Sequence, residues 1–322
     1  RLNGATATDN TATTIKYKGK KATTSPVTIT VTFTPSNTTN YEVVDATYTV
    51  NSVNKAKAIA PTIANTSNVY DGNPHTVETT SNGSGGTLKY RASTDGGSTY
   101  GNWQTTSPTI TDVSDATGGT LYVQAYIEAD SNHTNSDIKT ATATITAGEI
   151  SFTSGNYEGV YDAKSHTITG PTITKPASGT TVYYSDTVAL TASNYDTVGT
   201  TNKPSRTIVG TTTVYWYIKS GTTNYEGKSG YNTIKITQAD NPIEVTNPAV
   251  QYTGTTIDLN NSNYVRNNQG ALSWKIKTNG TTTASTISGS SVTLGAMNGS
   301  NDNNQTVVVT VTAEGNTNYK SG

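Results

Sequence analysis

One stretch of this chain, Val27 to Phe33 (VTITVTF), alternates strictly between apolar and polar residues, which is typical of a half-buried β-strand. A turn and an Asn-Tyr pair follow it. Similar segments begin at Leu121, Val214 and Val307. Aligning them on the closing asparagine gives spacings of 95, 89 and 94 residues between Asn40, Asn135, Asn224 and Asn318. One immunoglobulin-like domain is about this long, so the pattern predicts a tandem array.

The alternation also predicts which side chains of the recurring segment face a core, because successive residues of a strand point to opposite faces. We expect the inward set to be Val27, Ile29, Val31 and Phe33 in the first copy, Leu121, Val123, Ala125 and Ile127 in the second, Val214, Trp216 and Ile218 in the third, and Val307, Val309 and Val311 in the fourth. A core aromatic on an earlier strand is expected at Tyr90, Tyr183 and Trp274.

A second landmark, a tyrosine near the start of each unit, recurs at intervals of 91 residues at Tyr70, Tyr161 and Tyr252. Together the landmarks predict four repeats, at 1–56, 57–147, 148–239 and 240–322. The first holds only closing strands, and the last stops before its final strand. We therefore expect the chain to be a piece of a longer protein, with an unpaired sheet edge at each end that a neighbouring copy could pair with.

No Gly/Ser-rich or Pro-rich linker separates the repeats, so stiff end-to-end junctions are expected. The Asn-Tyr motif itself is interpreted as a corner within its own domain. The asparagine would bond nearby backbone, and the tyrosine would pack across the end of the sandwich, as in the tyrosine corner of immunoglobulin domains.

The composition supports an all-β fold and excludes some partners. Threonine makes up about a fifth of the chain, 20 tyrosines are present, and no long stretch shows helical period. Only 13% of residues are charged, and 21 basic residues nearly cancel 22 acidic ones, which argues against nucleic acid or an anionic membrane as a partner. There is no cysteine, so no disulfide closes a domain. No apolar run approaches the ~20 residues of a membrane span.

Several segments resemble the bacterial immunoglobulin-like repeats of Gram-positive surface proteins, the MBG/YDG type. The resemblance rests on VYDGNPHTV (69–77), YRASTDGGSTYGNW (90–103) and TNYEG (223–227). The first unit is similar to the closing half of that repeat and the fourth to a related repeat, although Thr253 stands where an Asp follows the tyrosine in the others. The resemblance implies tandem sandwiches on a bacterial cell surface or cell wall, acting as a stalk.

Candidate catalytic and metal-binding groups are few. His75 and His166 occupy the same repeat position, near Asp71 and Asp162, either as acid–base or metal-ligand pairs or as polar residues on an outer face. The turn beginning at Asp95 would need further carboxylates to hold Ca²⁺. No nucleophile elbow, phosphate loop or zinc motif occurs. We expect no catalytic, cofactor or metal site, and no enzyme.

The outward face of the recurring strand differs among the repeats. The second and third present tyrosines, which would form a candidate ligand face of Tyr122, Tyr126, Tyr215 and Tyr217. Exposed rings can stack on sugars, whereas cross-strand aromatic pairing would simply stabilise the sheet. The sequence therefore predicts a structural stalk or fibre segment of an extracellular, adhesin-type protein. The alternative is a module that binds host or cell-wall glycans, such as mucin.

Overall fold

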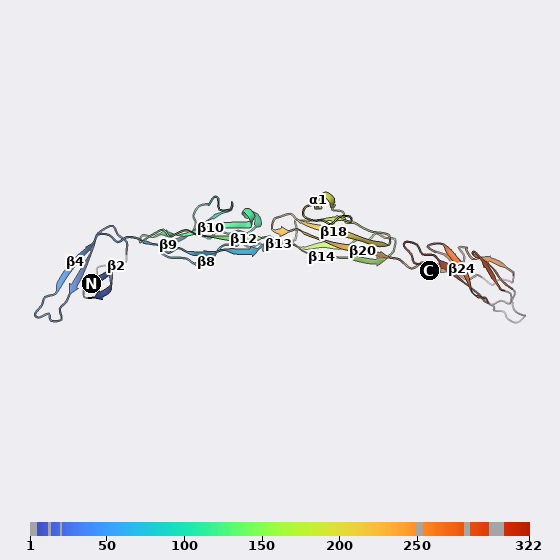
Figure 1. Ribbon diagram of the computed structural model, residues 1–322, viewed down its shortest axis with the longest axis horizontal. Helices are drawn as coiled ribbons and strands as arrows, with labels where there is room; N and C mark the ends of the chain where they lie inside the picture. Colours follow the sequence, from blue (N-terminus) through green and yellow to red (C-terminus); the bar gives the residue numbers. More distant parts are fainter. Residues whose placement is uncertain (1–4, 12–13, 20, 249–253, 280–283, 296–305) are drawn as a thin grey trace. The chain divides into compact units, whose positions relative to one another are not determined.

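The computed structural model describes residues 5–11, 14–19, 21–248, 254–279, 284–295 and 306–322 (Figure 1). Within them the regular secondary structure is almost entirely β-strand, which confirms the predicted all-β class of tandem immunoglobulin-like sandwiches. The chain forms two compact units, 1–149 with 222–226, and 150–221 with 227–322. No described helix is long and apolar enough to cross a bilayer.

The second repeat, in the first compact unit, consists of two facing sheets. The larger has the order β7 (Thr66–Val69), β12 (Lys139–Thr146), β10 (Thr120–Ala129) and β9 (Gly86–Ser93), and the smaller pairs β6 (Thr62–Ala64) with β8 (Glu78–Ser81). β12 runs antiparallel to β10 and parallel to β7. The predicted inward residues of β10 are at most 4% exposed and join a core with Ile110 and Ile145, so this prediction is confirmed.

The first repeat contains two hairpins, β1 (Ala5–Thr11) with β2 (Thr14–Gly19), and β3 (Val27–Phe33) with β4 (Val44–Val50). Of the predicted inward set, Ile29 is buried but Phe33 is 67% exposed, so the prediction for Phe33 is wrong. Phe33 pairs with Val44, itself 59% exposed, at the tip of a two-stranded hairpin where no second layer covers it.

The third repeat, in the second compact unit, repeats the topology of the second. The larger sheet has the order β15 (Tyr157–Val160), β20 (Lys228–Thr237), β18 (Gly210–Ser220) and β17 (Thr180–Ser185), and the smaller pairs β14 (Ser151–Gly155) with β16 (Thr169–Lys175). A single helical turn, α1 (Tyr195–Val198), lies between β17 and β18. The predicted inward residues of β18 are at most 4% exposed, as expected.

The core aromatic of the third repeat is Tyr184 rather than Tyr183. Tyr184 pairs with Trp216 in the same way that Tyr90 pairs with Ala125, and both Tyr90 and Tyr184 are 6% exposed. The prediction for Tyr183 is wrong by one position, which places that side chain on the opposite face of the sheet.

The fourth repeat has three small sheets. They are β24 (Leu272–Asn279) with β27 (Val307–Ala313), β22 (Thr256–Asp258) with β26 (Ser291–Thr293) and β25 (Thr286–Ser288), and β21 (Glu244–Val245) with β23 (Val265–Arg266). The predicted inward valines of β27 are half-buried, and so is Trp274, for which the core prediction is wrong. Among the described strands β27 has a neighbour on one side only, whereas β10 and β18 have two. Tyr252 lies outside the described residues.

Replacing Ile218 by alanine should destabilise the third repeat by about 2–5 kcal/mol, because Ile218 is fully buried and its truncation leaves a cavity. Ile208→Ala is the matched control, because Ile208 lies in the same repeat and is 53% exposed. This substitution should cost less than about 1 kcal/mol. The free energy of unfolding of each variant can be measured by denaturant unfolding followed by Trp216 fluorescence, in a protein whose Trp103 and Trp274 are replaced by Phe. Equal losses would contradict the assigned core.

Candidate functional site

A loop in each of the last three repeats pairs with a short segment at the boundary with the preceding repeat in sequence. β11 (His133–Thr134) runs parallel to β5 (Ala56–Lys57), and β19 (Tyr225–Glu226) runs parallel to β13 (Gly148–Glu149). A single parallel bridge joins Ala239 to Tyr319. Residues 222–226 belong to the first compact unit, so the first two pairings lie within that unit and the third lies within the second.

An asparagine side chain makes the same contact at each of these three places. Its Oδ1 accepts a hydrogen bond from a backbone N–H about 110 residues earlier. The bonds are Ala22 N to Asn132 at 3.0 Å, Val113 N to Asn224 at 2.8 Å and Val209 N to Asn318 at 3.1 Å. The backbone carbonyl of the same asparagine accepts a bond from the pairing segment, at Ala56, Gly148 and Ala239. We call Asn132, Asn224 and Asn318 the docking asparagines.

The docking asparagines correct the sequence alignment. The structural equivalent of Asn224 in the second repeat is Asn132, because each precedes the residue that pairs with the earlier segment. Asn135 instead accepts a hydrogen bond from Ala129 N within its own loop. With Asn132 in place of Asn135, the intervals between successive asparagines (Asn40, Asn132, Asn224 and Asn318) become 92, 92 and 94 residues. The predicted corner within one domain is wrong for Asn224 and Asn318, whose side chains bond to distant backbone.

Local structure positions the receiving N–H groups. Val113 opens the 3₁₀ turn η1 (Val113–Asp115), in which the Asp115 carboxylate accepts bonds from Thr111 N and Asp112 N. The first N–H groups of a helical turn have no partner inside the turn, which leaves Val113 N available to Asn224. In the third repeat the Arg206 guanidinium donates to the carbonyls of Ile208 and Val209, holding the segment that presents Val209 N.

A tyrosine pair accompanies the docking asparagine at two of the three places. The Tyr225 ring meets Tyr70 edge to face at 5.4 Å, and the Tyr319 ring meets Tyr161 at 5.3 Å, both with an interplanar angle of 79°. Tyr70 and Tyr161 are the two described tyrosines of the Tyr-Asp landmark. Edge-to-face pairs add roughly 0.5–1.5 kcal/mol beyond the area they bury.

One charged group, the Asp112 carboxylate, lies near the first of these tyrosine pairs. The Asn224 amide donates to the Asp112 carboxylate at 2.7 Å. Burial, followed by the nearby Asp112 charge, raises the pKa of Tyr70 above its ordinary value.

Solvent-exposed ion pairs also join Lys57 to Asp137 at 2.6 Å and Lys320 to Asp240 at 2.8 Å. Because such pairs are screened by water, they add little to stability.

In the first repeat the same motif has no docking partner among the residues that the structure describes. Asn40 and Tyr41 are exposed, Tyr41 by 66%, whereas Asn224 is 9% exposed and Tyr225 and Tyr319 are half-buried. The Tyr41 ring lines a shallow hollow with Phe33 and Val44 at the tip of the β3–β4 hairpin. Docking, rather than the motif alone, therefore buries the asparagine and the tyrosine.

The candidate ligand face is largely covered by loops. In the second repeat Tyr122 and Tyr126 are half-buried, and Trp103 meets Tyr126 edge to face at 4.4 Å. The Arg91 guanidinium lies 4.4 Å from the Trp103 ring and donates to Gln124 at 2.8 Å. Trp103, which the sequence did not assign to a strand face, belongs to the loop that folds over this sheet.

In the third repeat Tyr215 is half-buried, but Tyr217 is only 8% exposed, so the expectation that Tyr217 is exposed is wrong. The ring of Tyr195, on α1, stacks on Tyr217 at 4.8 Å and meets Tyr183 edge to face at 4.8 Å. The alternation of the strand predicts the correct face but gives no information on the loop that covers it.

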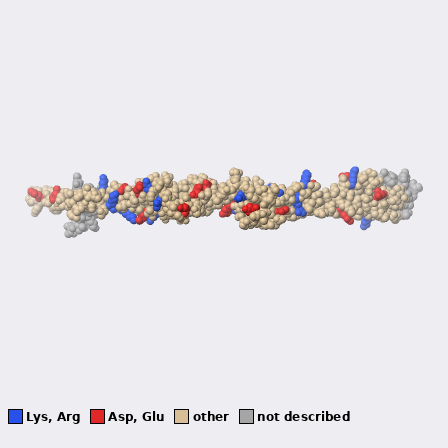
Figure 2. Space-filling view, turned by 90° about the horizontal axis from the view of Figure 1, so that it is seen from above, with Lys and Arg blue, Asp and Glu red and all other residues tan. Residues whose placement is uncertain are grey.

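The histidine–aspartate pairs close turns. His75 lies 3.0 Å from Asp71 and His166 lies 2.8 Å from Asp162, and each carboxylate also accepts a backbone N–H two residues on. These bonds lower the pKa of both aspartates. The described residues contain no group of three or more His, Asp or Glu side chains that could hold a metal ion. Figure 2 shows both signs of charge interspersed over the face in view.

The Asp95 carboxylate, a candidate Ca²⁺ ligand by sequence, is used by its own loop. It accepts hydrogen bonds from Ser98 N at 3.0 Å and Thr99 N at 2.9 Å, and from the hydroxyls of Ser93 and Thr99. The loop that carries Trp103 is therefore anchored by an ionised carboxylate.

Replacing Asn318 by alanine should leave the Val209 N–H without an acceptor, at a cost of about 1–3 kcal/mol. Hydrogen exchange of peptides covering Val209 should then accelerate about five-fold to a hundred-fold. Asn40→Ala is the matched control, because Asn40 holds the same repeat position without docking, and it should change nothing. Unchanged exchange in Asn318→Ala would show that the asparagine does not hold this segment.

Acid should loosen the loop that carries Trp103. Hydrogen bonds from Ser93 and Thr99 hold the pKa of Asp95 well below its ordinary value. The stabilisation is therefore complete above the ordinary aspartate pKa and is lost as the pH falls from about 4 toward the lower folded value. Trp103 fluorescence, with Trp216 and Trp274 replaced by Phe, should report this transition. Asp95→Asn should flatten it, and an identical pH profile in that variant would refute the assignment.

No protein-family model and no curated protein matches this sequence. Similar solved structures include the extracellular domain of protocadherin GammaB4, which is 12% identical with a TM-score of 0.27 over 90% of this chain and 54% of that one. Extracellular cadherin domains 3–6 of protocadherin Gamma B2 are 12% identical, with a TM-score of 0.28 over 90% of this chain and 80% of that one. This chain thus spans about half the length of the GammaB4 structure. The fold assignment rests on the strand pairing of the chain itself.

Proposed function

We propose that this protein is a non-enzymatic structural spacer, a stalk or fibre segment of an extracellular, adhesin-type surface protein. The observation that carries the proposal is one recurring contact, which we call the docking contact. In it, the side-chain Oδ1 of a docking asparagine (Asn132, Asn224 or Asn318) accepts a hydrogen bond from a backbone N–H of the preceding repeat. A protein that only needed covalently linked domains would not require a recurring, part-buried side-chain bond from each of these repeats to the backbone of the preceding repeat.

The energetics of the contact favour a restrained junction. Each docking asparagine contributes a side-chain and a backbone hydrogen bond, and its loop adds parallel strand pairing. A buried polar group that loses its partner costs about 1–3 kcal/mol, so separating the loop from its segment breaks several bonds together. Restrained junctions transmit position along a chain, which is what a spacer requires.

The bacterial surface location is part of the same proposal, supported by the sequence resemblance to MBG/YDG-type repeats and by the absence of cysteine. The Tyr faces of the second and third repeats are weaker candidates for a glycan site, since Tyr217 is buried and Tyr126 is covered by Trp103. Pairing with a neighbouring copy through unpaired end strands remains a prediction.

The spacer function can be tested by electron-spin distance measurement, because the chain has no native cysteine to compete with labels. Labels at Thr181→Cys and Thr310→Cys, both on exposed strand positions, report on the third and fourth repeats within one compact unit. We expect a narrow distance distribution that broadens in Asn318→Ala and stays narrow in the Asn40→Ala control. A distribution that is already broad in the unmodified pair would refute the spacer function.

A further inference from the structure

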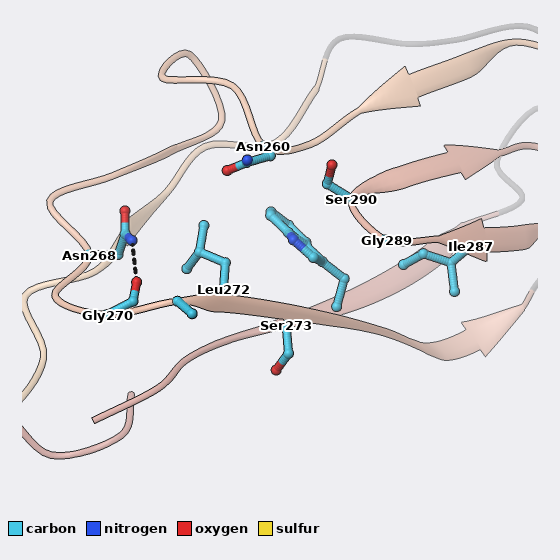
Figure 3. Close-up of a pocket in the computed structure, with 10 residues that line it drawn as sticks. Asn260, Asn268, Gly270, Leu272, Ser273, Ile287, Gly289 and Ser290 are labelled. Atoms are coloured by element: carbon cyan, nitrogen blue, oxygen red, sulfur yellow. Dashed lines mark hydrogen bonds between the residues drawn. The ribbon is translucent and has the colours of Figure 1, made fainter. Parts of the chain in front are cut away.

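The fourth repeat contains an open hollow of about 650 Å³ (Figure 3). Its lining comes from the loops before β24, the start of β24 and the β25–β26 hairpin, and includes Asn260, Asn268, Leu272, Trp274, Ile287 and Ser290. Small-molecule sites in proteins occupy about 300–1,000 Å³, so the hollow is large enough for a small ligand.

The hollow lies beside Trp274, whose equivalent positions are buried in the second and third repeats. Trp274 pairs with Val311 on β27, in the place where Tyr90 pairs with Ala125 and Tyr184 with Trp216. Tyr90 and Tyr184 are each 6% exposed, within a core. Trp274 is only half-buried, because the hollow opens beside it. An aromatic ring that serves the core elsewhere is accessible here.

The apolar base of the hollow is bordered by uncharged polar groups. Leu272 and Ile287 are half-buried like Trp274, and in Figure 3 Asn260 and Ser290 lie across the hollow from the strand that carries Leu272. None of the described residues that line the hollow is a Lys, Arg, Asp or Glu. Its chemistry therefore suits a neutral ligand that has both an apolar face and hydroxyl groups.

The polar side chains retain hydrogen-bonding capacity. Asn268 Nδ2 donates to the Gly270 carbonyl at 2.9 Å, which fixes the amide and leaves its second N–H available. The Ser290 hydroxyl donates to Asp258 at 2.6 Å and can still accept. Asn260 is held through its backbone N–H by Asp258 at 3.0 Å, and its exposed amide has no hydrogen-bond partner among the described residues.

We propose that this hollow binds a neutral saccharide. The apolar face of a pyranose ring packs against the Trp274 indole, and sugar hydroxyls bond to the amides of Asn260 and Asn268 and to the Ser290 hydroxyl. The indole supplies contact area, and the amides fix orientation. The charges of sialylated, uronic-acid and sulfated glycans gain no attraction here, since the described lining contains no basic group. The site goes beyond the spacer function and does not depend on it.

The test applies the whole chain to an array of neutral gluco-, manno-, galacto- and N-acetylhexosamine oligosaccharides, with sialylated and sulfated sets beside them. The expected result is binding to one or more neutral oligosaccharides and to none of the acidic sets. Calorimetry with the same oligosaccharides then gives the affinity. Binding only to acidic glycans, or to none, would overturn the proposal.

Three variants locate the binding in the hollow. Trp274→Ala should weaken it at least about ten-fold. Asn260→Ala should weaken it about five-fold or more without affecting folding, because Asn260 is exposed and its side chain makes no internal bond. Ser273→Ala is the matched control, since Ser273 also borders the hollow but its hydroxyl donates to the Thr312 carbonyl and points away from Asn260 and Ser290 in Figure 3. Affinity unchanged in both Trp274→Ala and Asn260→Ala would overturn the proposal.

Discussion

A hydrogen bond from a backbone N–H to an asparagine side chain about 110 residues later governs much of this structure. An amide withdrawn from water must find a partner, and here each partner comes from the following repeat. The bond at Val113 and Asn224 orders a 3₁₀ turn, a loop, a parallel strand pair and a tyrosine contact together. Without docking, as at Asn40 and Tyr41, the same residues lie exposed.

The alternation of apolar and polar residues predicts the strands and most of their buried faces, because a strand has a fixed period of two. Val123, Val214 and Ile218 are fully buried as this period requires. The repeat length near 90 residues likewise predicts the sandwiches. These features depend on local sequence only, and local sequence is sufficient to specify them.

Features that depend on register or on loops were not accessible from the same pattern. Tyr183 and Tyr184 are adjacent tyrosines, and only the pairing with Trp216 shows which one is buried. Asn132 and Asn135 lie in one loop, and the choice between them depends on a contact with Ala22, far away in sequence. Tyr217 was expected to be exposed, but a loop residue, Tyr195, covers it. Trp274 is half-buried because a hollow opens beside it, which no strand pattern encodes.

The docking contact also bears on how such a chain can change length. The second and third repeats each carry both halves of the contact, a receiving N–H at Val113 or Val209 and a docking asparagine at Asn132 or Asn224. Duplicating or deleting one whole repeat therefore brings together halves that already match, and no new interface has to arise. The gene could gain or lose repeats by recombination while every remaining junction keeps its bond, which would make the reach of the protein a readily adjustable trait.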